Sequence, residues 1–118
     1  MTIKELYEAV GGDYEDIYSR FGNEEMIKMF LDMFLREPSF GKLKEAMEAD
    51  DMETAFAMAH TVKGVCANIA FKRLQELSSE LTEDLRGGKD IAAAKELFPR
   101  ALACYEDTVN MIKEYKEA

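Results

Sequence analysis

Three residues, His60, Lys63 and Gly64, have the types and the spacing that a phosphoryl-transfer site needs, and His60 is the only histidine of the chain. A neutral imidazole is present at cellular pH and can act as a nucleophile. A lysine about one helical turn away can neutralise an anion carried by that imidazole. A glycine in a helix interior costs about 1 kcal/mol relative to alanine, so Gly64 indicates that something must approach His60 closely. We interpret His60 as a phosphorylatable histidine, with Lys63 as its charge partner and Gly64 as the clearance residue.

The segment that carries these residues is predicted to be one helix, from about Asp51 to Phe71. Its apolar residues form an ordinary core stripe on a helical wheel, and His60 falls on a different face. The residues that share the face of His60 are Ala57, Lys63, Gly64, Ala67 and, at the far end, Phe71. Because most of these side chains are small, we expect the face to be accessible, with Ala57, Ala67 and Phe71 contacting a partner.

Capping residues and glycine turns predict further helices along the chain. Their expected ranges are Ile3 to Val10, Tyr14 to Phe21, Glu24 to Arg36, Phe40 to Ala49, Lys72 to Arg86, and a last helix from Asp90 to about Tyr115 that Pro99 should kink. No strand-like alternation competes with this pattern. We therefore expect one all-α domain over residues 1–118, a four-helix bundle with short additional N-terminal helices at one end.

The predicted helix from Glu24 to Arg36 has more apolar surface than one core contact requires. Its apolar residues span about 240° of the wheel, whereas a core face needs about 100°. Either neighbouring helices cover this helix on several sides, or one edge of the arc is an exposed docking patch for a partner. The two candidate edges are Met29 with Met33 and Leu31 with Leu35, and the sequence alone does not choose between them. We name Met29 and Met33 as candidate partner contacts.

The stretch from Ala59 to Ile69 resembles the signature of histidine-containing phosphotransfer (HPt) domains. That signature is a histidine, two residues, Lys-Gly, and then a run of small and apolar residues that ends in a glycine. The resemblance extends over essentially the whole chain, with one departure, because Ala70 stands where the family usually has glycine. Since position 70 falls at the edge of the core stripe, we expect the departure to alter helix packing rather than phosphotransfer.

The resemblance implies a phosphorelay carrier of two-component signalling. His60 would accept a phosphoryl group from a receiver-domain aspartate and pass it to another receiver. The implied partners are a response-regulator receiver domain and a hybrid sensor histidine kinase. Mg²⁺ is expected on the receiver, so no intrinsic cofactor or metal is expected here. The alternatives are a helical adaptor that docks receivers without carrying phosphate, and a helical bundle that binds an apolar ligand.

Charge and composition exclude other classes of function. The formal net charge of −9 disfavours binding to nucleic acid or to an anionic membrane surface. No apolar run approaches the length of about 18 residues that a membrane span needs, and the N-terminus does not resemble a signal peptide. No glycine-rich nucleotide loop occurs, so we do not expect ATP-dependent kinase activity. We expect a cytoplasmic, monomeric protein in which Cys66 and Cys104 are buried and reduced.

Overall fold

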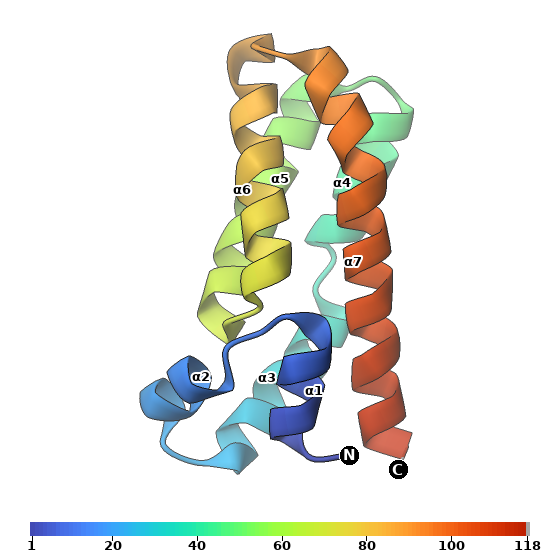
Figure 1. Ribbon diagram of the computed structural model, residues 1–118. Coiled ribbons are helices and arrows are strands. Elements are labelled where there is room, and N and C mark those ends of the chain that lie inside the picture. The colour runs from blue at the N-terminus through green and yellow to red at the C-terminus, as the bar shows by residue number, and fades with distance from the viewer. Residues whose placement is uncertain (118) are drawn as a thin grey trace.

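The computed structural model describes residues 1–117, which form seven α-helices and one 3-10 turn and contain no strand (Figure 1). The elements are α1 (Ile3–Val10), α2 (Tyr14–Phe21), α3 (Glu24–Arg36), α4 (Ser39–Glu48), α5 (Met52–Ile69), α6 (Lys72–Leu85), η1 (Arg86–Gly88) and α7 (Ile91–Glu117). The predicted all-α class is therefore confirmed. Helix α7 continues through Pro99 as one helix, so the proline does not divide it.

Helices α4, α5, α6 and α7 form the bundle, and α1, α2 and α3 lie at its lower end in Figure 1. Helix α5 packs against α4 and α6, and α7 packs against α6 and α4, so α5 and α7 lie on a diagonal of the bundle. Helix α3 contacts both α5 and α7. This arrangement confirms the predicted four-helix bundle with short helices at one end.

Local side-chain caps explain most of the helix starts. Thr2, Asp13, Asn23 and Asp51 each accept a hydrogen bond from a backbone N–H in the first turn of the helix that follows. Asp90 likewise accepts from the backbone N–H of Ala93 in α7. Helix α4 begins differently, because the backbone N–H of Ser39 donates to Oε1 of Glu37 at 2.6 Å.

The corner between α5 and α6 corrects the sequence prediction at Phe71. Helix α5 ends at Ile69, and Ala70 takes a left-handed conformation with φ of 59°. The chain reverses there, so Phe71 leaves the face of His60 and turns into the core, where it is 1% exposed. Its ring packs against Tyr7 and Phe34, with centroid distances of 5.2 and 5.1 Å. The prediction that Phe71 contacts a partner is therefore wrong.

The conformation of Ala70 also explains what the departure from the family pattern changes. A left-handed residue after a helix is usually glycine, because a Cβ is strained in that conformation. Ala70 adopts this strained conformation at the helix end and is itself fully buried. The departure therefore affects the geometry of the α5 terminus, which lies three helical turns from His60 rather than beside it.

Helix α3 uses one edge of its apolar arc for the core and leaves the other exposed. Ile27, Leu31 and Phe34 are buried, and Leu35 is half-buried. In contrast, 52% of Met29 and 47% of Met33 are exposed. The structure thus selects the Met29–Met33 edge as the exposed one.

The two bundle cysteines are buried and unpaired with each other. Burial raises the pKa of the Cys66 thiol to about 12 and also raises the pKa of Cys104. Both thiols are therefore protonated at neutral pH, and the expectation that both cysteines are buried is confirmed.

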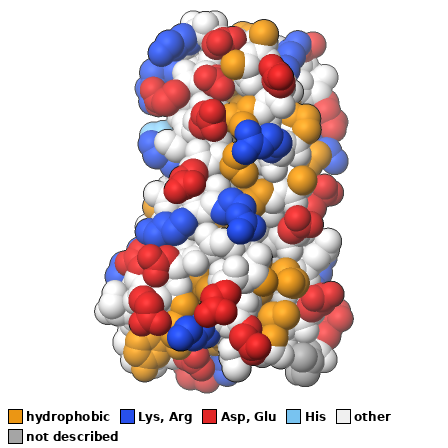
Figure 2. Space-filling view, viewed as in Figure 1, with side chains coloured by type: hydrophobic (Ala, Val, Ile, Leu, Met, Phe, Trp, Pro, Cys, Tyr) orange, Lys and Arg blue, Asp and Glu red, His pale blue; other side chains and the backbone are white. Residues whose placement is uncertain are grey.

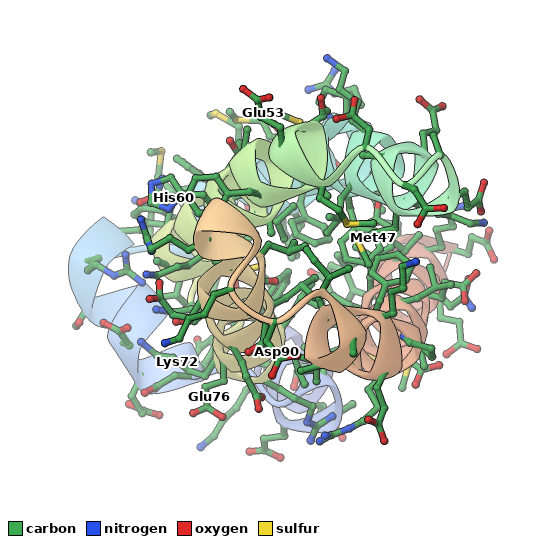
Figure 3. The ribbon with its side chains drawn as sticks, turned by 90° about the horizontal axis from the view of Figure 1, so that it is seen from above. Met47, Glu53, His60, Lys72, Glu76 and Asp90 are labelled. Atoms are coloured by element: carbon green, nitrogen blue, oxygen red, sulfur yellow. The ribbon has the colours of Figure 1, made fainter. Side chains whose placement is uncertain are left out.

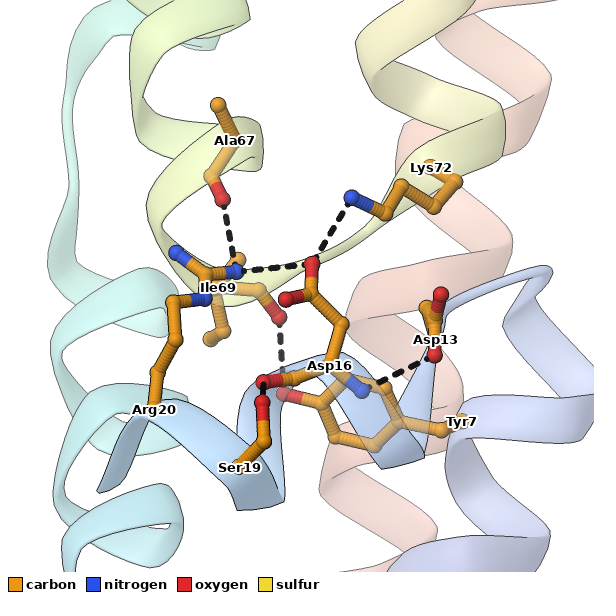
Figure 4. A network of polar contacts seen from close by, with 8 residues as sticks. All are labelled: Tyr7, Asp13, Asp16, Ser19, Arg20, Ala67, Ile69 and Lys72. Atoms are coloured by element: carbon orange, nitrogen blue, oxygen red, sulfur yellow. Dashed lines mark hydrogen bonds and ion pairs between the residues drawn. The ribbon is translucent and has the colours of Figure 1, made fainter.

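Helices α1 and α2 bind the C-terminal end of α5 through its last carbonyl groups (Figure 4). The hydroxyl of Tyr7 donates to the carbonyl oxygen of Ile69 at 2.9 Å, and Nη2 of Arg20 donates to that of Ala67 at 3.0 Å. The backbone N–H of Asp13 donates to the carbonyl oxygen of Ala70 at 2.9 Å. The bonds to Ile69 and Ala70 satisfy acceptors that a helix end otherwise leaves without intrahelical donors, while the Ala67 carbonyl also accepts from the backbone N–H of Ala70. The N-terminal helices therefore fix the end of the helix that carries His60.

We expect Tyr7→Phe to lower the free energy of unfolding by about 1–3 kcal/mol, because it leaves the buried Ile69 carbonyl without its hydroxyl donor. The matched control is Tyr14→Phe, which removes the hydrogen bond from the Tyr14 hydroxyl to Glu24 at an exposed site. That change should stay within about 0.5 kcal/mol. Urea denaturation measures both variants, and equal losses would show that the Tyr7 hydroxyl has no special role.

Candidate functional site

His60 lies in the middle of α5 and is exposed. Seen from above, its side chain points outward from the bundle, whereas Met47 points into the space among the bundle helices (Figure 3). The ring of Phe56, one turn earlier, lies nearly parallel to the imidazole, with 16° between the planes and 6.3 Å between the centroids. The imidazole thus has an aromatic ring at some distance on one side, and the side chain is exposed to solvent.

The predicted small residues around His60 leave its face open. Ala57 and Gly64 are exposed, and Ala67 is half-buried. A Cβ added at Gly64 would meet nothing within 4 Å, so no neighbour within the chain requires a glycine there. The glycine therefore leaves free space outside the helix and relieves no internal contact, and its role as the clearance residue stays a prediction.

Basic side chains gather beside His60. Lys63 is half-buried on the same helix, and the guanidinium of Arg86 lies over the Phe56 ring, with 5.0 Å between Cζ and the centroid. The Glu83 carboxylate accepts a hydrogen bond from Nη2 of Arg86 at 3.0 Å, and this bond lowers the pKa of Glu83, with smaller contributions from the charges of Lys63 and Lys89. Figure 2 shows basic atoms beside the imidazole, while acidic side chains are spread over the face in view.

A shallow apolar groove runs between α3 and α5, next to the face of His60. Its volume is about 140 Å³, and its lining residues are Phe30, Met33, Phe34, Glu37, Val65, Asn68 and Ile69. Met33 is thus both exposed and part of the groove, while Met29 lies one turn away on α3. The candidate partner contacts Met29 and Met33 therefore lie on the α3 side of a surface whose other side is formed by α5.

Sequence reasoning missed Phe56 and Arg86 as neighbours of His60. The spacing of four residues between Phe56 and His60 is a signal for side-chain contact on one helix face. Arg86 could have been found from the antiparallel pairing of α5 and α6, because Phe56 lies 15 residues before Phe71 and Arg86 lies 15 residues after it. Positions equally distant from a tight turn between antiparallel helices lie opposite each other.

Two other features are absent from residues 1–117. No three His, Cys, Asp or Glu side chains come together there in a group that would hold a metal ion. Within the same part of the chain, no helix combines the length and the apolar character needed to cross a membrane.

An exposed histidine on a four-helix bundle, followed by a lysine and then a glycine, is the arrangement expected of a histidine phosphotransfer module. The family model described as Hpt domain matches residues 25–115, well over half of the chain. The protein belongs to the Hpt domain family, whose domains carry phosphoryl groups on histidine in two-component phosphorelays. No curated protein and no solved structure matches the chain significantly.

Proposed function

We propose that this protein is a phosphorelay carrier that accepts a phosphoryl group on His60 from a receiver-domain aspartate and passes it to a second receiver. The observation that supports this most is the open face of α5, on which the exposed His60 is the only histidine of the chain and is bordered by small residues. Membership of the Hpt family supports phosphoryl transfer as the chemistry of this face. A hybrid sensor histidine kinase would supply the first receiver.

In the proposed step, a nitrogen of the His60 imidazole attacks the phosphorus of the aspartyl phosphate. The new N–P bond forms as the P–O bond to the aspartate breaks, and the carboxylate leaves on the receiver. The reverse reaction delivers the phosphoryl group to the second receiver. The Mg²⁺ that stabilises the transferring charge would be held by the receiver, so this chain contributes the nucleophile and its surroundings.

Lys63 would act as the charge partner of the phosphoryl group. Phosphorylation adds nearly two negative charges to a protein whose net charge is already −9. The support for this role is the position of Lys63 one turn from His60 and the absence of acidic residues in α5 from Thr54 to Ile69. A cation close to the imidazole lowers the electrostatic free energy of the phosphorylated state.

The test is direct labelling with phosphoramidate, a small donor that needs no partner protein. We expect one phosphoryl group to be incorporated, in a form that acid hydrolyses and alkali leaves intact, and mass spectrometry should map it to the α5 peptide. Purified receiver domains of the same organism should then remove the label. An unlabelled protein that still binds receivers would instead support the adaptor function.

The exposed edge of α3 should take part in receiver docking. We expect Met29→Ser combined with Met33→Ser to weaken receiver binding about tenfold while the melting temperature changes little, because both side chains are about half exposed. As a control, Leu31→Ala removes a side chain that is 1% exposed and should lower the free energy of unfolding by about 2–5 kcal/mol. Calorimetry measures binding and stability in both variants. If the methionine variant binds as tightly as the wild type, the receiver docks away from α3.

A further inference from the structure

Arg20, on the short helix α2, lies at the far end of the open face of α5. Its Nη2 donates to the carbonyl oxygen of Ala67 at 3.0 Å and to the carboxylate of Asp16 at 3.3 Å. In Figure 4 the other terminal nitrogen of the guanidinium points away from these two partners. A guanidinium has five N–H donors, and within residues 1–117 the hydrogen bonds of Arg20 use Nη2 alone. Arg20 is thus fixed by one nitrogen while Nη1 and Nε keep their donors for another molecule.

The position of Arg20 brings it within the footprint of a partner docked on His60. Ala67 follows His60 by seven residues on the same face, which is about 10 Å along the helix axis. A protein partner of ordinary size covers about 800 Å² on each side, a patch that extends on the order of 15 Å from its centre. A receiver that brings its aspartate to His60 therefore also covers Arg20.

The charges around this face fit an acidic partner surface. Helix α5 has no acidic residue between Thr54 and Ile69, although the chain has 24 aspartates and glutamates. The nearest carboxylate at this end, Asp16, is shared by Arg20 and by Lys72, whose Nζ lies 2.8 Å away. The hydrogen bond from Lys72 holds the pKa of Asp16 below its usual value, so this carboxylate is ionised and already compensated. Two cations therefore face one carboxylate here, and the group keeps a net positive charge that attracts a second carboxylate.

We propose that Arg20 is a docking residue that binds a carboxylate on the receiver surface, so that α2 helps to select the receiver. The proposal rests on the proposed function. Because Nη1 of Arg20 has no acceptor within residues 1–117, its N–H groups can donate a charge-assisted hydrogen bond to a carboxylate of the receiver. Helices α1 and α2 lie outside residues 25–115, so the family match does not describe this contact.

The experiment uses the receiver domain of the same organism that removes the label fastest from phosphoramidate-treated protein. Its affinity is measured by calorimetry for the wild type, Arg20→Gln, Arg20→Lys and the control Arg100→Gln, which removes an exposed arginine on α7, diagonally opposite α5. We expect Arg20→Gln to weaken binding about tenfold at low salt, Arg20→Lys to weaken it less, and Arg100→Gln to bind as the wild type does. The difference between Arg20→Gln and the wild type should shrink as the salt concentration rises.

A purely structural role for Arg20 gives a different result. If Arg20 only binds the end of α5, both Arg20 variants lower the melting temperature while the affinity of the folded protein for the receiver, and its salt dependence, stay unchanged, and this overturns the proposal. Should Arg20→Gln fail to fold, Arg20→Lys decides by the same criteria, because lysine can still donate to the Ala67 carbonyl. Labelling of His60 by phosphoramidate should be equal in all folded variants. A wild type that takes no label contradicts the proposed function itself, whereas normal labelling with unchanged affinity contradicts only the role of Arg20.

Discussion

His60→Gln is expected to reduce incorporation of label from phosphoramidate to background. Glutamine is polar and suits a helix, but its amide nitrogen has no lone pair available for attack on phosphorus. Since His60 is exposed and its ring makes only a long contact with Phe56, the free energy of unfolding should change by no more than about 0.5 kcal/mol. The variant should therefore separate loss of chemistry from loss of structure. Phosphate-affinity electrophoresis measures the first, and thermal unfolding measures the second.

The neighbouring hydroxyl provides the control for this experiment. Thr61 is exposed next to His60, and its Oγ1 donates to the carbonyl oxygen of Ala57 at 3.0 Å. Thr61→Ala should keep the wild-type label, because the acceptor is the imidazole. Label that persists in His60→Gln, or that disappears in Thr61→Ala, would place the acceptor elsewhere and contradict the assignment of His60.

The helix starts could be predicted from the sequence because the signals that define them are local. Thr2, Asn23 and Asp51 each cap a helix through a backbone N–H three residues later, so a short window of sequence contains both partners. The position of His60 outside the core stripe was predictable for the same reason, since helical periodicity alone separates it from Ala59 and Val62. The mutual geometry of His60, Lys63 and Gly64 required no long-range contact.

Phe71 could not be placed correctly because its position depends on where the helix stops. Periodicity continues the stripe of His60 through position 71, but the chain turns at Ala70, a residue that seldom takes a left-handed conformation. A glycine at position 70 would have signalled the turn. The direction of Phe71 is set instead by contacts with Tyr7 and Phe34, which come from other helices.

The sequence could not show which edge of α3 is exposed, for a related reason. The arc of α3 offers two apolar edges of similar character, and only the packing of neighbouring helices shows that Leu31 is buried and Met33 exposed. Arg20 presents the same difficulty, because its partner Ala67 lies 47 residues away along the chain. Features of the site that depend on tertiary contacts thus became visible only in the structure, whereas the reactive histidine could be predicted from the sequence.

The second large effect is expected at Gly64, where Gly64→Gln should slow transfer between the protein and its receiver more than tenfold. A Cβ at this position extends into open space, so the longer side chain would project from the face that the receiver must cover. Glutamine is a better helix former than glycine, which means that unfolding would not account for the loss. Rapid-quench measurements of label transfer to the receiver would give the rate.

A comparison of a small phosphoryl donor with a receiver distinguishes steric exclusion of the receiver from damage to the histidine. Gly64→Gln should still take label from phosphoramidate at a rate within a few-fold of the wild type, because a small donor reaches His60 from the solvent side that stays open. Gly64→Ala should raise the free energy of unfolding by up to about 1 kcal/mol, since the added methyl group meets no neighbour within 4 Å and alanine suits a helix better. Full receiver transfer in Gly64→Gln would show that the glycine does not provide clearance. Equal losses with phosphoramidate and with the receiver would show that position 64 acts on the imidazole itself rather than on the approach of a protein.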